Sequence, residues 1–350
     1  MKYSRFILVF SLFIGVFYSC STDVDLYADY KDVAIIYAML NPRADTNYVK
    51  ITRAFCGTND NFINAEEVAL IYDSSNYSEK LDVRLVELKS TYGGSFVPTD
   101  RVLILDTMTI HNKEEGVFYS PDQLVYFTEE HLNVGTSGDK YAYRLVAVKP
   151  DGDTVTARST MVGNEEFCIE TNGMSFQLIP TEADGKLYFR ADGAASLYDI
   201  KIEFNYREQK LGQEMKRKRV SRSFGTRTLS EYTNLIGNSY YVEYSPNWLF
   251  NTLKGAIGGD TVVDANHPNV VRYIDDFIIY ISAGGDELNY YYLANQAQLN
   301  SPISLVTTYT NIEGGYGLFS SRTTIEKVVR LSSRCKSDLF SVSAWGFKEN

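Results

Sequence analysis

The chain is poor in the residues from which many enzymes build active sites. It has three histidines in 350 residues, His111, His131 and His267, and no two of them have the spacing of a zinc motif. No Gly-x-Ser-x-Gly motif marks a nucleophilic serine. The sequence therefore supports neither a zinc enzyme nor a serine hydrolase, and it predicts no metal site and no cofactor.

Cysteine, proline and tryptophan are scarce as well. Eight prolines and 24 glycines exclude a repetitive or linker-like chain. Four widely spaced cysteines are not a disulfide framework. If Cys20 carries a lipid, as argued below, then Cys56, Cys168 and Cys335 remain. We favour buried free thiols for these three, and one disulfide between two of them is the alternative.

Positive charge is the scarcer sign, with 34 basic residues against 44 acidic ones and a formal net charge of −10. Such a chain is a poor general partner for nucleic acid or anionic lipid. Hydrophobic residues still make up 44% of the sequence, which is enough to form folded cores. The 27 tyrosines and 19 phenylalanines favour β-strands with half-exposed faces.

The N-terminus has the features of an export signal. Lys2 precedes an apolar stretch, residues 6–17, which is too short to span a bilayer. The small residue Ser19 then precedes Cys20. In a bacterial lipoprotein, such a cysteine becomes the lipidated first residue of the mature chain.

We interpret residues 1–19 as a lipoprotein signal peptide and residues 20–31 as a lipidated acidic tether. An ordinary secretory signal is the alternative, because the residues before Cys20 match a lipobox loosely. Asp23 and Asp25 either mark export to the cell surface or belong to a polar tether. The lipid would anchor the protein to the outer membrane without a spanning helix.

Short β-rich runs separated by turns dominate residues 32–163. The clearest hairpin joins residues 140–148 to residues 154–160 around a Pro-Asp-Gly turn. Residues 101–110 read as a single strand. This spacing of strands and turns predicts an immunoglobulin-like or fibronectin-III-like β-sandwich.

A second domain, β-rich and α+β, is expected over residues 164–350. Alternation predicts that Tyr198, Ile200, Ile202, Phe204 and Tyr206 share one face of a strand. Helices are predicted at residues 247–254, ending at Gly255, and at residues 286–297. A final strand is predicted at residues 340–345. The expected fold class is therefore mainly β with a few helices.

Two segments resemble a known lipoprotein family. Residues 34–55, with Ala38-Met39-Leu40-Asn41-Pro42, resemble the opening of the family called domain of unknown function 4249, and residues 310–320 are similar to its Asn-Ile-x-x-Gly-x-Gly-x-Phe segment. The resemblance covers most of residues 30–330, loosely in the middle. Such proteins occur in Bacteroidetes, typically encoded beside TonB-dependent receptors. The resemblance implies an outer-membrane, receptor-associated role, and the family has no established catalytic residues to transfer.

The glycine-rich segment 311–320 is the most distinctive motif. It lacks the third glycine of a dinucleotide fingerprint and the Lys-Ser or Lys-Thr of a P-loop, so it does not predict a nucleotide site. Glycines here fit positive φ angles or the close approach of a neighbouring strand. The alternative is a loop that contacts a ligand or partner. Its candidate contact residues are Asn311, Gly314, Gly315, Tyr316, Gly317 and Phe319.

A basic run interrupts the acidic chain. Its candidate contact residues are Lys216, Arg217, Lys218 and Arg219, followed by Arg222 and Arg227. We favour an exposed strand or hairpin tip, where basic side chains also protect a sheet edge from unwanted pairing. Docking to an acidic partner or to lipopolysaccharide phosphates is the alternative.

Two further motifs leave alternatives open. Asp275 and Asp276 are the best local candidate for a carboxylate-based hydrolase. The interpretation that we favour is one outward Asp and one that is paired with Arg272 or lies at a strand irregularity. Trp248, Trp345 and the tyrosines at 290–292 either stack on sugar rings or belong to the core.

The leading hypothesis is a non-enzymatic outer-membrane lipoprotein that serves a TonB-dependent transporter by binding the receptor or its cargo. An independent surface adhesin for glycans or proteins, with Trp248 in the contact, is the alternative. A hydrolase is the third hypothesis.

Overall fold

The computed structural model describes residues 32–54, 65–111, 114–116, 119–120, 122–136, 138–170, 185–245, 247–259, 261–264, 268–300 and 309–349. The expected signal peptide, Cys20, the tether to residue 31, Cys56 and His267 lie outside the described residues. Val33–Asn350 forms one unit whose strands are arranged in several sheets. The prediction of a mainly β fold is confirmed.

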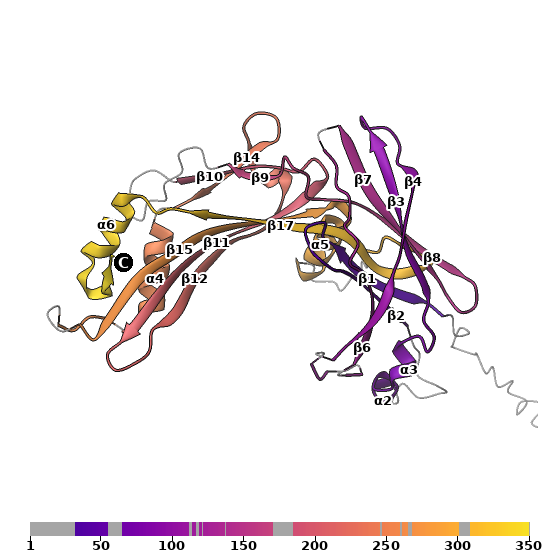
Figure 1. Cartoon of the computed structure of the whole chain (residues 1–350), viewed down its shortest axis with the longest axis horizontal. Helices are drawn as coiled ribbons and strands as arrows, with labels where there is room; N and C mark the ends of the chain where they lie inside the picture. The colour runs from indigo at the N-terminus through magenta and orange to yellow at the C-terminus, as the bar shows by residue number, and fades with distance from the viewer. Residues whose placement is uncertain are drawn as a thin grey trace, which may run out of the picture. The chain divides into compact units, whose positions relative to one another are not determined.

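A nine-stranded sheet combines strands from both ends of the chain. Its order is β12-β11-β15-β17-β1-β2-β6-β5, and β18 pairs with β15. Its strands are β1 (Ala34–Leu40), β2 (Asn47–Arg53), β5 (Asp106–Ile110), β6 (Gln123–Thr128), β11 (Ala195–Lys210), β12 (Lys216–Thr228), β15 (Val270–Gly285), β17 (Gly315–Val329) and β18 (Phe347–Lys348). The late strand β17, yellow in Figure 1, is parallel to β1 and joins the two halves of the sheet.

Two smaller sheets complete the described β structure. One has the order β16-β8-β7-β3-β4 and the other the order β13-β14-β10-β9. Their strands are β3 (Asp82–Thr91), β4 (Val97–Ile104), β7 (Asp139–Val148), β8 (Thr154–Thr160), β9 (Cys168–Glu170), β10 (Gly185–Arg190), β13 (Thr233–Asn234), β14 (Ser239–Tyr244) and β16 (Ile312–Glu313). The predicted hairpin is confirmed as β7 and β8.

The expected single strand at residues 101–110 is wrong, because the chain changes sheets at Leu105. β4 belongs to the five-stranded sheet and β5 to the nine-stranded sheet. Leu105 between them is buried, and its N–H donates to the Val83 carbonyl at 2.9 Å. The backbone N–H of this buried residue thus keeps a hydrogen-bond partner at the point where the chain passes from one sheet to the other. The alternation of apolar and polar residues does not reveal this change of sheet.

Helices cover less of the chain. They are α2 (Ala65–Ala69), α3 (Tyr72–Ser75), α4 (Asn247–Ile257), α5 (Asp286–Asn300) and α6 (Ser333–Ser341), with short 3₁₀ turns η3 (Leu229–Glu231) and η4 (Ser343–Trp345). α4 passes through Gly255 and ends before Gly258, whose φ of +53° fits a C-terminal cap better. The described helices are all too short or too polar to cross a membrane.

The strand expected at residues 340–345 is wrong, since these residues end α6 and form η4. The Ser332 side chain caps α6 by accepting a hydrogen bond from the Cys335 N–H at 3.1 Å. Cys335 and Leu339, one turn apart, are both buried. Helical packing of this pair overrides the β propensity of the aromatic residues that follow.

Two hydrophobic cores share the nine-stranded sheet. One is built by β1, β2, β6 and the five-stranded sheet, and the other by β11, β15, the four-stranded sheet, α4 and α6. β17 contributes Phe319 to the first core and Ile325 to the second. The nine-stranded sheet therefore has strands from both sides of the expected domain boundary between residues 163 and 164, and that boundary stays a prediction. The immunoglobulin-like or fibronectin-III-like topology stays a prediction.

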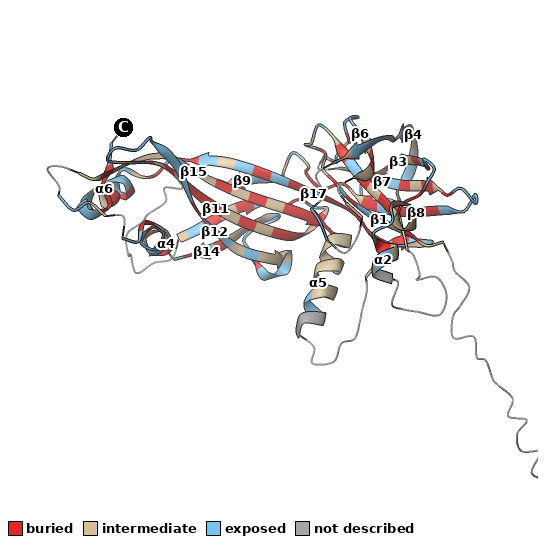
Figure 2. Cartoon of the chain, turned by 90° about the horizontal axis from the view of Figure 1, so that it is seen from below, coloured by how far each residue is buried: buried red, intermediate tan, exposed pale blue. Residues whose placement is uncertain are grey.

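Alternation along the strands sets these cores. The side chains from Tyr198 to Tyr206 that were expected to share a face are all buried. Figure 2 shows the resulting bands of buried and exposed residues along the strands of the nine-stranded sheet. The opposite face of this sheet is where the candidate site lies.

Candidate functional site

Alternate side chains of β1 and β2 form an exposed surface. Every second residue of β1 is buried, whereas Tyr37 and Met39 point to the other face and are 50% and 39% exposed. On β2, Tyr48 is 43% exposed, and Lys50 pairs directly with Tyr37. Directly paired residues point to the same face of a sheet. Two rings, a thioether and an amine therefore share this outer face.

Neighbouring strands extend the same surface. Tyr316 of β17 pairs with Ile35, and Phe127 of β6 pairs with Tyr48. Met108 of the edge strand β5 pairs with a valine of β6. Tyr316 is 56% exposed and Met108 39% exposed. We name this surface the aromatic face and define it by Tyr37, Met39, Tyr48, Met108, Phe127 and Tyr316.

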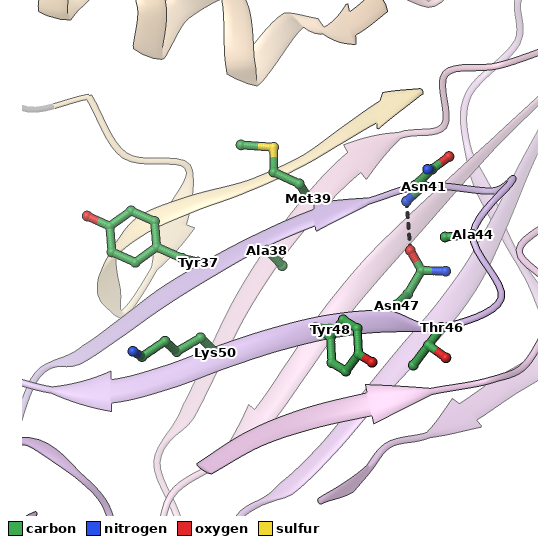
Figure 3. A pocket seen from close by; sticks show the side chains of 9 residues that line it. All are labelled: Tyr37, Ala38, Met39, Asn41, Ala44, Thr46, Asn47, Tyr48 and Lys50. Carbon is green, nitrogen blue, oxygen red and sulfur yellow. Dashed lines mark hydrogen bonds between the residues drawn. The ribbon is translucent and has the colours of Figure 1, made fainter. Parts of the chain in front are cut away.

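A hollow of about 410 Å³ opens on the aromatic face above β1, β2 and the turn between them. Figure 3 shows Tyr37, Met39 and Tyr48 around it, together with the polar residues of the turn. The Asn41 N–H donates to Asn47 Oδ1 at 2.7 Å and fixes this turn. At the other side, Lys50 Nζ donates to Gln123 Oε1 at 2.7 Å. Hydrogen bonds thus fix the backbone turn and the lysine side chain on either side of the tyrosine rings.

The chemistry of the aromatic face favours binding. Contiguous exposed apolar surface commonly marks an interaction site. Tyrosine, phenylalanine and methionine are enriched at the centres of protein interfaces, where they supply contact area at small entropic cost. Tyr and Met side chains do not by themselves supply a nucleophile with an adjacent base. The face is therefore suited to packing or stacking against a partner.

The glycines of segment 311–320 allow β17 to lie beside β1. A Cβ atom at Gly317 would lie 1.9 Å from the Ile36 carbonyl oxygen, and the φ angle of Gly317 is +120°. A Cβ atom at Gly315 would lie 2.5 Å from the Ala34 carbonyl oxygen. Gly314 has a φ of +80°. These contacts agree with the interpretation of positive φ and close backbone approach.

The other candidate residues of this segment divide between core and surface. Asn311 Nδ2 donates to the Phe319 carbonyl at 2.7 Å, and its Oδ1 accepts from the Phe319 N–H at 3.0 Å. Phe319 is fully buried. The structure therefore places Phe319 in the core, Asn311 half-buried and hydrogen-bonded to the backbone of Phe319, and Tyr316 on the aromatic face.

The basic run lies on β12, at one edge of the nine-stranded sheet. Lys216, Arg217, Lys218 and Arg219 are all exposed, as expected for an exposed strand. Lys218 Nζ lies 4.0 Å from Glu208, and Arg219 lies 3.7 Å from Glu203. The side chains of both glutamates are less than 10% exposed. Part of the positive charge thus balances carboxylates of the neighbouring strand.

Asp275 and Asp276 occupy an irregularity in the pairing of β15 with β11. Phe204 and Tyr206 pair with Phe277 and Ile274, so two aspartates face one residue of β11. This is a β-bulge, which redirects side chains. Asp275 Oδ1 accepts a hydrogen bond from Arg207 Nε at 2.7 Å. The expected strand irregularity is confirmed, but the expected pairing with Arg272 is wrong, because Asp275 binds Arg207 while Arg272 forms a buried ion pair with Glu208.

A polar hollow of about 500 Å³ brings the two charged motifs together. It is lined by Arg217 of the basic strand and by both aspartates of the bulge. The two motifs are almost sixty positions apart in the sequence, and no sequence pattern predicted that they lie close together. They do so because β11 pairs with both β12 and β15.

The remaining aromatic and cysteine candidates lie mostly inside. Trp248 and Trp345 are 4% and 6% exposed, so their rings are not available for stacking on sugars. Tyr290 of α5 is exposed. The two described cysteines are free thiols. The expected burial is confirmed for Cys335, but it is wrong for Cys168, which is exposed.

The described ionisable groups show no metal site, and histidines do not cluster. No group of three or more His, Cys, Asp or Glu side chains among the described residues could hold a metal ion. His111 Nδ1 lies 2.7 Å from Asp122. His131 contributes its carbonyl to Arg101 Nη2 at 2.6 Å.

Two carboxyl groups with shifted pKa values lie outside the set of residues that define the aromatic face. Glu287, at the start of α5, accepts from Ser159 Oγ at 2.9 Å and Ser320 Oγ at 3.4 Å, and burial raises its pKa above the ordinary value. Burial alone would also raise the pKa of Glu87, but side-chain donors led by Tyr143, at 2.8 Å, lower it. Both groups are tied into the fold by these donors.

No family model matches the chain, and no curated protein matches it either. The resemblance to domain of unknown function 4249 therefore stays a prediction.

The candidate site was largely missed from the sequence. Tyr316 was proposed as a contact residue, but Tyr37, Met39 and Tyr48 were not. The run from Ala34 to Leu40 is apolar at nearly every position, which predicts a strand buried on both faces. The one available signal was β2, where Tyr48 and Lys50 alternate with apolar residues and thus predict a face open to solvent.

Proposed function

We propose that the protein is a non-enzymatic, lipid-anchored outer-membrane protein that serves a TonB-dependent transporter, and that it binds the receptor through the aromatic face. The observation that carries this proposal is the exposure of Tyr37, Tyr48 and Tyr316 on one continuous sheet surface. The partner class comes from the family resemblance, and the anchor comes from the export signal before Cys20.

The energetics of interfaces support a binding role for these rings. A few aromatic side chains usually carry most of the affinity of an interface, and truncating one costs about 2 kcal/mol or more. The three tyrosines lie on neighbouring strands whose backbone is fixed by pairing. They would therefore meet a partner with little loss of conformational entropy.

The test is capture from the native membrane. The tagged full-length protein is extracted gently from the outer membrane, and co-eluting proteins are identified by mass spectrometry. We expect a stoichiometric β-barrel receptor, and we expect Tyr37→Ser combined with Tyr48→Ser to reduce its recovery at least about tenfold. Tyr92→Ser is the matched control, because Tyr92 is 90% exposed in the turn after β3.

Two outcomes would contradict the proposal. If the protein elutes alone at normal abundance and still lipidated, the accessory role is wrong. If the receptor is recovered equally with the double variant, the role can stand but the aromatic face is not the contact. Cys20→Ala tests the anchor separately, because it should release the protein from the membrane without changing the face.

Glycan binding is the second candidate function. Rings beside amides are a common arrangement for stacking on sugars, and the hollow places Tyr37 and Tyr48 near Asn41 and Asn47. The expected result would be retarded migration in native gels that contain xylan or mannan, with normal migration restored by Tyr37→Ser. The hydrolase hypothesis has less support, because Asp275 is held in its ion pair with Arg207.

A further inference from the structure

The strand β12 ends the nine-stranded sheet on the side opposite β5. It is 13 residues long, and its pairing partner is β11. Among the described strands, none pairs with its other side. An edge strand of this length presents a row of backbone N–H and C=O groups that another extended chain could pair with.

The charge of β12 is opposite to that of the molecule. Six of its 13 residues are Lys or Arg and none is acidic, whereas the whole chain has a net charge of −10. The run from Lys216 to Arg219 is exposed throughout. A local field of this kind acts over roughly 8 Å at physiological ionic strength, so it can attract an anion despite the distant negative charge.

The basic side chains stand on both faces of the edge. Lys216 pairs with Glu208 and Arg217 with Arg207, and successive residues of a strand point to opposite faces. Lys218 therefore lies on the side of Lys216, and Arg219 on the side of Arg217. An added strand also alternates its side chains between the two faces, so acidic residues on both of its faces would meet basic neighbours.

Edge protection alone needs less charge than β12 carries. Natural edge strands are commonly blocked by a lysine, a proline or a bulge. β12 combines four consecutive basic residues with an arginine-rich composition, and guanidinium groups bind carboxylates in paired geometry. Lys218 and Arg219 already balance Glu208 and Glu203, which leaves Lys216 and Arg217 as the residues to test.

We propose that β12 binds an extended acidic peptide segment of a partner protein as an added strand of the nine-stranded sheet. This proposal is independent of the aromatic face and of the receptor assignment. Backbone pairing would supply affinity that does not depend on sequence, and the alternating basic side chains would select acidic segments.

The test uses the full chain and a labelled, capped peptide as long as β12, with Glu on both faces and Val and Thr elsewhere. Fluorescence anisotropy measures binding, and hydrogen exchange measures protection of the β12 amides. We expect saturable binding, slower exchange in β12, and affinity about tenfold weaker in Lys216→Gln combined with Arg217→Gln. Arg334→Gln with Lys336→Gln, on exposed positions of α6, is the charge-matched control.

A second peptide keeps the glutamates but replaces Val and Thr with Pro, which removes backbone donors. Equal binding of this peptide, or binding without slower exchange in β12, would show simple charge attraction and overturn strand addition. Absence of peptide binding would also overturn the proposal. Vesicles with phosphatidylglycerol provide the rival partner: if only they bind, and binding requires Lys216 and Arg217, the edge recognises a phosphate surface instead.

Discussion

At the β5 end of the nine-stranded sheet the outer face carries tyrosine, phenylalanine and methionine, whereas at the β12 end it carries arginine, lysine and carboxylates. Part of the charge at this end is balanced within the fold. Lys201 Nζ lies 3.2 Å from Glu203, and Arg207 Nε lies 2.7 Å from Asp275. The aromatic end instead leaves its tyrosine rings about half exposed.

The two ends share one backbone, so the difference lies in their side chains alone. β17 belongs to both ends: Tyr316 lies on the aromatic face, while Arg322 and Glu326 lie further along the same outer face by alternation. Between them, α5 packs against β17, β15 and β11. Stability at the charged end should therefore depend on internal pairs, whereas changes at the aromatic end should affect binding and leave stability nearly unchanged.

The largest expected effect is at the buried ion pair of the charged end. Arg272 is fully buried, donates to Glu208 Oε2 through Nε at 2.9 Å, and donates to the Trp345 carbonyl through Nη1 at 2.7 Å. Arg272→Leu leaves Glu208 buried without its main partner, which should cost about 3–5 kcal/mol in the free energy of unfolding. Urea unfolding measures this cost as a lower midpoint at unchanged slope.

The control is Arg272→Leu combined with Glu208→Leu, which removes both charges. Replacing a whole buried pair by apolar residues is often close to neutral, so the double variant should recover most of the loss. A loss below about 1 kcal/mol in the single variant would show that the charged end does not depend on this pair.

The next largest effect is expected where β17 meets β1. Alanine at Gly317 would place its Cβ against the Ile36 carbonyl, in a backbone conformation that disfavours side chains. Gly317→Ala should cost more than about 2 kcal/mol in unfolding free energy. Gly212→Ala is the matched control, because Gly212 has a φ of +74° with open space around it, and it should cost about 1 kcal/mol. Equal losses in both variants would mean that the close approach to β1 is unimportant.

Sequence patterns predicted individual strands better than their neighbours. The glycines of segment 311–320 indicated close backbone approach, and the space around Gly315 and Gly317 agrees with that interpretation. The pairing of β1 with β17 spans almost the whole chain, and no local pattern encodes it. The exposure of Tyr37 and Met39 depends on which face of the assembled sheet is covered by the core, so the candidate site could not be assembled from the sequence.

Local chemistry also has limits where tertiary packing competes with propensity. Trp345 was a candidate for sugar stacking, yet its carbonyl accepts from Arg272 and its ring packs 4.6 Å from that of Phe250. The helical turn before it is set by the buried pair Cys335 and Leu339. The sequence around Trp345 does not distinguish a ring that is exposed for sugar stacking from a ring that is buried in the core. The residues that decide this, Arg272 and Phe250, lie far away in sequence.

A smaller effect, on pH dependence, is expected at the helix between the two ends. Burial raises the pKa of Glu287, so its contribution to stability is fully present below the unfolded pKa and is lost as pH rises through the folded pKa. Glu287→Gln stays neutral, and its stability should therefore exceed that of the unmodified protein by an amount, on the order of 1 kcal/mol, that grows with pH. Thermal unfolding between acidic and neutral pH measures the difference.

Glu87→Gln should show the opposite slope and serves as the control. The pKa of Glu87 is lowered, so its stabilising contribution is present above the unfolded pKa and is lost as pH falls through the folded pKa. The variant should therefore be less stable than the unmodified protein at neutral pH and approach it in acid. Parallel profiles for the two variants would contradict this assignment.

The smallest stability effect is expected on the aromatic face itself, and it is the most informative for the comparison. Tyr37→Ser combined with Tyr48→Ser removes rings that are about half exposed, so the free energy of unfolding should change by no more than about 1 kcal/mol in total. Lys216→Gln combined with Arg217→Gln should change it as little, because the ion pairs Lys218–Glu208 and Arg219–Glu203 remain. If the tyrosine variant instead loses several kcal/mol, these rings stabilise the fold, and the binding role of the aromatic face loses its main support. A small loss of stability with a large loss of receptor capture is the combination that a binding surface requires.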